Sequence, residues 1–159
     1  MRFNKFGCVA AWGMIGLLAV PALGDDDLID LAQVPAVVTQ AAAKAVPGAR
    51  WTSAEKDDED GKVVYELSGA NAKGQVVDVS VTAEGTVLEV ETEIALADVP
   101  AVVTAALKAK HPKFKPESVE SVAKNGKVVA YEFDGDGPNG EDVEISVSAD
   151  GKTVNIVND

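Results

Sequence analysis

The chain has 159 residues and carries 26 acidic against 14 basic side chains, so its formal net charge is −12. This excess of carboxylates argues against nucleic acid as a partner, because binding to phosphates needs clustered Lys and Arg. The chain holds a single cysteine, Cys8, which excludes an intramolecular disulfide. The fold must therefore be held by its own apolar core.

Residues 1–24 have the pattern of an export signal. Arg2 and Lys5 precede the mostly apolar run from Val9 to Val20, and Ala22-Leu23-Gly24 is a small-x-small cleavage site. The run is shorter than the roughly 20 residues that cross a bilayer, so stable membrane insertion after cleavage is not expected. The pattern predicts a periplasmic or secreted protein that begins at Asp25, with 12 basic and 26 acidic residues and a net charge of −14.

The remainder of the chain is predicted to be a duplication that follows an acidic lead at residues 25–33. The segment VPAVVT at 34–39 recurs at 99–104, and GKVV at 61–64 recurs at 126–129. These matches predict one repeat at residues 34–97 and a second at 98–159. A single unit of this size buries only about 60% of its unfolded surface and is marginal alone. The two units are therefore expected to share a core or a sheet.

The first repeat is predicted to begin with a helix from Pro35 to Val46, because proline suits the first helical turn and alanine has the highest helix propensity. Four strands follow at residues 50–57, 62–68, 77–82 and 88–94, where alternation predicts an antiparallel meander with one wet face. The apolar positions of the helix lie at helical spacing and predict one buried face. They are Val34, Val38, Ala41, Ala42 and Ala45.

The second repeat follows the same plan, with a helix at 100–110 and strands at 116–123, 127–134, 141–148 and 152–157. The predicted fold class is α+β, with two tandem repeats that each pack one helix on a four-stranded antiparallel meander. The direct join at 92–98 favours a continuous or side-by-side sheet over independent domains. The predicted inward set of the second repeat is Val129, Tyr131, Phe133, Val143, Ile145, Val147, Val154 and Ile156.

This order of motifs resembles the PepSY-like, β-lactamase-inhibitor-like family of exported bacterial proteins. The resemblance rests on the VPAVVT helix, the strands at 61–67 and 126–133, and the alternating strands at 77–81 and 143–147. It implies helix-plus-meander units and a non-enzymatic binding module of the cell envelope. The inhibitors bind an enzyme on a concave sheet face, but this chain lacks their disulfides and aromatic-rich surface. Inhibition of a β-lactamase is therefore not expected of it.

No set of catalytic residues is apparent in the sequence, and we predict that the protein is not an enzyme. His111 is the only histidine, and its place at a predicted helix end favours a capping role. Glu89, Glu91 and Glu93 alternate with apolar residues, so they are expected to form a solvated strand face rather than an acid/base pair. A hydrolase that uses carboxylates is the weaker alternative.

Two further features are candidates for binding. Asp134, Asp136, Asn139 and Asp142 are spaced around glycines in one acidic turn and are candidate calcium ligands, although Pro138 interrupts the loop pattern and a simple hairpin turn explains them better. No other cofactor is predicted. Trp51 is a candidate partner-binding residue if it points outward. A place in the core is the favoured interpretation.

The favoured function is an exported binding or interaction module with an unidentified protein partner in the envelope. Its acidic sheet face suits a basic or cationic partner. Simple protein binding and inhibition of a peptidase or another enzyme both remain open. A weak calcium-binding scaffold is the alternative that rests on the acidic turn.

Overall fold

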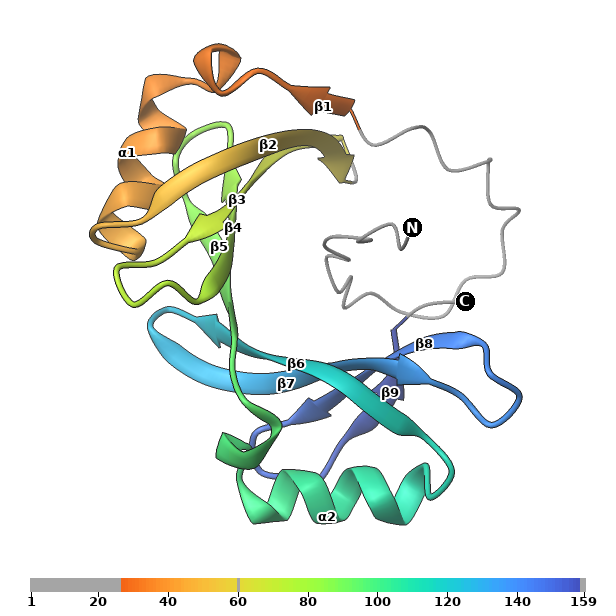
Figure 1. The fold of residues 1–159 in the computed structure, drawn as a ribbon. Coiled ribbons are helices and arrows are strands. Elements are labelled where there is room, and N and C mark those ends of the chain that lie inside the picture. The colour runs from red at the N-terminus through yellow and green to blue at the C-terminus, as the bar shows by residue number, and fades with distance from the viewer. Residues whose placement is uncertain (1–26, 60, 158–159) are drawn as a thin grey trace.

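The protein is described from a computed structural model that covers residues 27–59 and 61–157. The predicted export signal at 1–24 lies outside these residues. The fold is α+β, as predicted, with one nine-stranded antiparallel sheet whose strand order follows the chain (Figure 1). The strands are β1 (Asp27–Ile29), β2 (Arg50–Glu59), β3 (Lys62–Ala70), β4 (Val76–Thr82), β5 (Val87–Glu93), β6 (Lys115–Lys124), β7 (Lys127–Asp136), β8 (Asp142–Ser148) and β9 (Val154–Ile156).

Two α-helices and two short 3-10 helices complete the fold. They are η1 (Leu31–Gln33), α1 (Ala36–Ala45), η2 (Leu96–Asp98) and α2 (Ala101–Lys110). We refer to residues 27–93 as the first half and to residues 94–157 as the second half. After β1, which has no counterpart within the second half, both halves have the same order of elements: a 3-10 helix, an α-helix and four strands. Neither α-helix in the described residues has the length and apolar content that a bilayer crossing requires.

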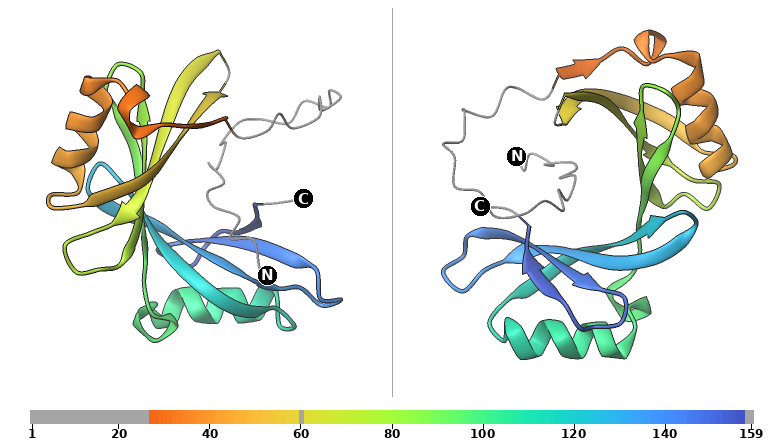
Figure 2. Two further views of the ribbon diagram at one scale, coloured as in Figure 1. Left: turned by 45° about the horizontal axis from the view of Figure 1, so that its top comes forward. Right: turned by 180° about the vertical axis from the view of Figure 1, so that it is seen from behind.

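The two halves share one continuous sheet, because β5 of the first half pairs with β6 of the second. The pairs run from Val90 opposite Ala123 to Glu93 opposite Glu120. The sheet bends strongly, and both helices lie on its convex side (Figures 1 and 2). The opposite, helix-free side is concave. We call it the concave face.

Each half has its own apolar core between its helix and the sheet. Under α1 the core is formed by Val34, Val38, Ala42, Ala54, Leu67, Val77, Val79 and Val81. Under α2 it is formed by Val99, Val103, Leu107, Val119, Phe133, Ile145 and Val147. The alternation therefore predicted the helix-side residues of β4 and β8 correctly. Three residues predicted to point inward differ, since Ala45 is exposed, Val129 is 36% exposed and Ile156 is 53% exposed.

Residues 27–33 of the predicted acidic lead form a strand of the sheet and a short 3-10 helix. Strand β1 pairs with β2, and Asp30 caps η1 by accepting a hydrogen bond from the Ala32 amide at 2.8 Å. In this pairing Leu28 lies opposite Glu55. The equivalent pair, one repeat later in the sequence, is Glu93 opposite Glu120. Strand β1 thus covers the edge of β2 as β5 covers the edge of β6.

The exposure of Val129 follows from a β-bulge. In the first half, the register from Asp57 opposite Val64 to Glu59 opposite Lys62 is unbroken. In the second half, Val122 pairs with Ala130 but the next residue, Ala123, pairs with Val128, which leaves Val129 as the extra residue. The sequence of the second half is one residue longer at this point, and a bulge accommodates such an insertion by bending one strand.

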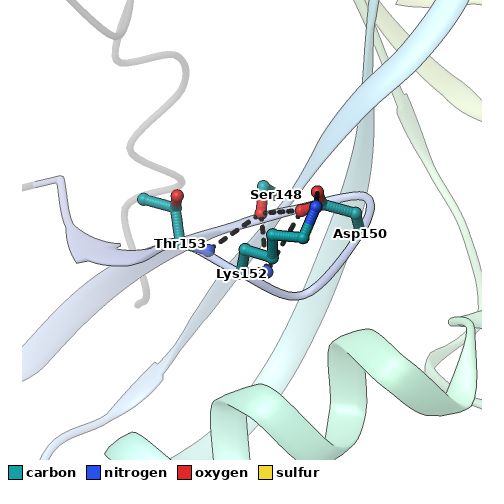
Figure 3. A network of polar contacts seen from close by, with 4 residues as sticks. All are labelled: Ser148, Asp150, Lys152 and Thr153. Atoms are coloured by element: carbon teal, nitrogen blue, oxygen red, sulfur yellow. Dashed lines mark hydrogen bonds and ion pairs between the residues drawn. The ribbon is translucent and has the colours of Figure 1, made fainter.

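The turns before β5 and β9 pack closely against the helices. Gly85 and Gly151 both have positive φ, and a Cβ at these positions would lie 2.7 Å and 2.9 Å from a methyl group of Val37 and Val102, respectively. In the second of these turns, Ser148 donates to Asp150 at 2.8 Å and accepts from the Thr153 amide at 3.0 Å (Figure 3). The Lys152 ammonium lies 2.9 Å from Asp150, and its hydrogen bond is the main cause that lowers the pKa of that carboxyl.

Candidate functional site

The concave face carries the acidic half of the strand alternation. Val77, Val79 and Val81 of β4 face α1, so Asp78 and Ser80 between them point to the helix-free side. Residues directly opposite one another in an antiparallel pair share a face, and the register therefore extends this assignment from β3 to β8. Seven carboxylates of these strands form what we call the concave acidic cluster: Glu66, Asp78, Glu89, Glu91, Glu120, Glu132 and Glu144.

Several of these carboxylates lie directly opposite another acid. Asp78 faces Glu91 across β4 and β5, and Glu120 of β6 faces Glu132 of β7. Glu120 also faces Glu93 on its other side. Side chains in such positions approach within about 4.5–5.5 Å at Cβ, and like charges at this separation are destabilising. The cluster therefore concentrates negative charge instead of dispersing it.

The carboxylates at the centre of the cluster are buried. Asp78, Glu89, Glu91 and Glu132 are only 5%, 3%, 7% and 6% exposed. This corrects the sequence-based expectation that Glu89 and Glu91 belong to a solvated face. Alternation along one strand shows which face a side chain occupies, but it does not show how far that face is covered.

Burial raises the pKa of four glutamates on this face. Desolvation is the main cause in each, and it places the pKa of Glu91 at about 10, that of Glu120 at about 8, and those of Glu132 and Glu144 at about 7. Repulsion from neighbouring carboxylates adds to the rise. For Glu120 the first of these neighbours is Asp78, two strands away. The cluster is thus electrostatically coupled across the junction of the two halves.

Few positive groups offset this charge. Lys124 forms an ion pair of 3.0 Å with Glu89. Asp78 accepts a hydrogen bond from the side chain of Ser68, but its Oδ1 is buried without a hydrogen-bond partner in the described part of the chain. Burial also raises the pKa of Asp78. An unsatisfied buried carboxylate oxygen is costly, and a ligand that donates to it would remove that cost.

The four candidate calcium ligands do not converge on one point. Asp134 lies within β7, where Ser118 donates to it at 3.2 Å, and Asp136 faces Asp142 across β7 and β8. Asn139 lies in the turn between these strands, where its amide donates to Glu141 at 2.8 Å. Among residues 27–59 and 61–157, no three acidic, histidine or cysteine side chains are grouped so as to hold a metal ion. The calcium site stays a prediction.

Trp51 and His111 have structural places in the fold. Trp51 is partly buried and packs against the core under α1, in line with the favoured interpretation. It therefore lies apart from the concave acidic cluster. His111 is the C-cap of α2, and its amide donates to the carbonyl of Leu107 at 2.8 Å.

Sequence reasoning did not single out Asp78, Glu120 or Glu132, which are central to the cluster. Their signal was present in the alternation, because Asp78 lies between Val77 and Val79, and Glu132 lies between Tyr131 and Phe133. The pattern did not show that these acids from three strands meet. That depends on the register between β5 and β6 and on the bend of the sheet.

The comparison with protein families confirms the resemblance to PepSY-like proteins. Residues 35–91 match the family model PepSY, described as "Peptidase propeptide and YPEB domain". The match spans α1 and the strands β2 to β4 and most of β5. A comparison with curated protein sequences gives no significant match.

Solved structures with the same fold come from Bacteroides. A DUF2874 family protein of Bacteroides uniformis ATCC 8492 has a TM-score of 0.59 at 19% identity, covering 77% of this chain and 89% of its own. A protein of Bacteroides eggerthii DSM 20697 assigned to the periplasm has a TM-score of 0.58 at 19% identity, with 77% and 88% covered. A BLIP-like protein of Bacteroides fragilis NCTC 9343 has a TM-score of 0.56 at 17% identity, with 77% and 86% covered.

Proposed function

We propose that the protein is an exported, non-enzymatic binding module whose concave acidic cluster receives a basic segment of a partner protein. The observation that carries this proposal is Asp78, a buried carboxylate with one oxygen unsatisfied within the described residues, amid other acids. Separately, Glu91 lies directly opposite it. A Lys or Arg side chain entering this face would supply both a donor and a compensating charge.

The physical argument is one of charge compensation. Buried carboxylates without cations favour protonation, which is why the pKa of Glu91 rises to about 10. A partner guanidinium or ammonium group would favour the charged form and form short charge-assisted hydrogen bonds with it. A net charge of −12 would also attract a basic partner over longer distances, and this attraction weakens with salt.

The architecture and location agree with this role. The two helix-plus-meander halves are proposed to descend from one duplicated unit, and their shared sheet has a concave, helix-free face. The fold is similar to that of a BLIP-like protein. The periplasmic or secreted location predicted from residues 1–24 agrees with the periplasmic assignment of the Bacteroides eggerthii protein. Inhibition of a peptidase would be one form of this binding, suggested by the words "peptidase propeptide" in the family description.

A hydrolase that uses carboxylates has less support. The four glutamates with raised pKa lie on the sheet face, whereas the cavity of about 380 Å³ described below has a single carboxylate, Glu141, among its lining residues. General acid/base catalysis needs the acids to line the site that holds the substrate.

The proposal can be tested by capturing partners from an envelope extract on the purified protein. A variant that combines Asp78→Asn, Glu91→Gln and Glu120→Gln would neutralise the cluster, while Glu84→Gln with Asp98→Asn would neutralise two exposed acids elsewhere. The same captured protein is then measured by calorimetry against all three forms at low and moderate salt.

The expected result is a basic partner whose affinity falls at least about tenfold with the cluster variant and far less with the control. Equal affinity for the two variants would place the binding surface elsewhere. A partner that binds the unchanged protein independently of salt would contradict charge compensation.

A further inference from the structure

A cavity of about 380 Å³ lies between the end of α2 and the turn that joins β7 to β8, away from the concave acidic cluster. Its walls include Phe114, Val143 and Ile156, and its rim carries Lys110, His111 and Lys113. This volume is within the range of roughly 300–1,000 Å³ that is typical of small-molecule sites. An apolar cavity with a basic rim is unexpected in so acidic a chain.

The chain builds this rim with a tight turn. Pro112 occupies the second position of a turn closed by the Phe114 amide, which donates to the His111 carbonyl at 3.1 Å. Proline favours this position because its φ is already fixed near the required value. The turn directs Phe114 against the core under α2 and leaves Lys113 exposed.

The positive charge of the two lysines on the rim is only partly offset. Within the described ranges, neither Lys110 nor Lys113 forms an ion pair. Glu141 also lines the cavity, and its Oε2 accepts a hydrogen bond from the Asn139 amide at 2.8 Å, so one carboxylate accompanies the two lysines. The C-terminal end of a helix favours a positively charged side chain, which accounts for Lys110. It does not account for Lys113 or for the apolar walls of the cavity.

The first half lacks these features at the equivalent positions. Ala45, Val46 and Gly48 stand where the second half has Lys110, His111 and Lys113. The place of Ile156, which is 53% exposed, is taken by Val90, which is partly buried where β5 pairs with β6. The basic rim and the exposed wall are thus specific to the second half, so helix-plus-meander packing alone does not require them.

We propose that this cavity binds an unbranched apolar chain that ends in a carboxylate, such as a medium-chain fatty acid. The apolar chain would cover Phe114, Val143 and Ile156, and the carboxylate would lie between Lys110 and Lys113. The apolar chain matches the apolar wall, because burial of apolar surface is favourable. The carboxylate matches the two lysines, because ammonium groups form charge-assisted hydrogen bonds with carboxylates. This site is independent of the partner-binding role proposed above.

The test is a titration of the purified protein with decanoate, followed by the amide resonances of Phe114 and Val143. Decylammonium, which has the same chain and the opposite charge, is the matched control ligand. Decanoate is expected to bind at least about tenfold more tightly than decylammonium and to shift both resonances. Equal affinities, shifts confined to the concave face, or no shift would overturn the proposal.

Two variants locate the site. Lys110→Glu with Lys113→Glu should weaken decanoate binding at least about tenfold, whereas Lys44→Glu with Lys62→Glu changes the net charge equally and should leave it almost unchanged. Ile156→Ser tests the apolar wall at an exposed position, where the fold should tolerate it, and should also weaken binding. Equal effects of the two double variants would show that only net charge matters and would contradict the proposed site.

Discussion

The same alternating strands bury apolar side chains on one face of the sheet and acidic side chains on the other. On the convex side, Val79 and Ile145 are buried under the two helices in apolar cores. On the concave side, Asp78 and Glu91 are buried to a similar degree but lie among like charges. Burial of apolar side chains on the convex side stabilises the fold, whereas burial of carboxylates on the concave side destabilises it. The binding role proposed for the concave face would account for this difference, and four measurements test the contrast.

The largest effect is expected on the convex side. Phe133→Ala removes a 2% exposed side chain from the core under α2 and should lower the free energy of unfolding by about 3–5 kcal/mol. Val129→Ala, on the same strand but at a 36% exposed position, is the control and should cost less than about 1 kcal/mol. Urea denaturation of both variants would measure this. Similar losses for the two would contradict the assigned core.

The concave face should make stability depend on pH. The pKa values of Glu91, Glu120, Glu132 and Glu144 are raised to between about 7 and about 10, above the unfolded value of 4.5. The folded state therefore holds more protons than the unfolded state above pH 4.5, and stability falls as pH rises toward 10. The free energy of unfolding should be lower at pH 9 than at pH 6, on the order of a few kcal/mol. A value that rises over this range would contradict the burial of these acids.

Replacing one acid should separate stability from binding. With a pKa of about 10, Glu91 is mostly protonated in the folded state at pH 9 but ionised in the unfolded state, so folding must take up a proton. Glu91→Gln removes this requirement and should raise the free energy of unfolding at pH 9 by at least about 1–2 kcal/mol. The gain should shrink at pH 5, because there the unfolded carboxyl is itself partly protonated. Thermal melts at both pH values, with exposed Glu84→Gln as control, would show this. The same gain at both pH values would point to packing instead of charge.

The smallest effect concerns the predicted calcium site. A weak site with a dissociation constant near 1 mM would stabilise the fold by only about 0.4 kcal/mol at 1 mM calcium. Asp142→Asn should abolish this gain, and removal of calcium with a chelator should reverse it. Calorimetry that detects no heat with the unchanged protein would eliminate Asp134, Asp136, Asn139 and Asp142 as ligands.

Sequence periodicity was sufficient for the helices, the long strands and most of the convex core. Strand β1 was not predicted, because the repeat was taken to begin at Val34. Ile29 and Leu31 also correspond to Ile94 and Leu96, so the repeat begins earlier. The extra residue at 127–130 signalled an insertion, but the register was needed to show that Val129 forms the bulge.

The concave acidic cluster was harder to predict for a different reason. Alternation assigned Glu89 and Glu91 to the correct face of β5 but could not show that they are buried. The acids of this face come from both halves, and burial together with the charge of Asp78 in the first half raises the pKa of Glu120 in the second. A local pattern contains no information on such an arrangement of strands distant in the sequence.

Strand β5 completes the sheet of the first half and also covers the edge of β6 in the second. Neither half can lose its structure without exposing one side of this strand and its unpaired backbone groups. The two halves should therefore melt together in a single cooperative transition, despite their separate cores.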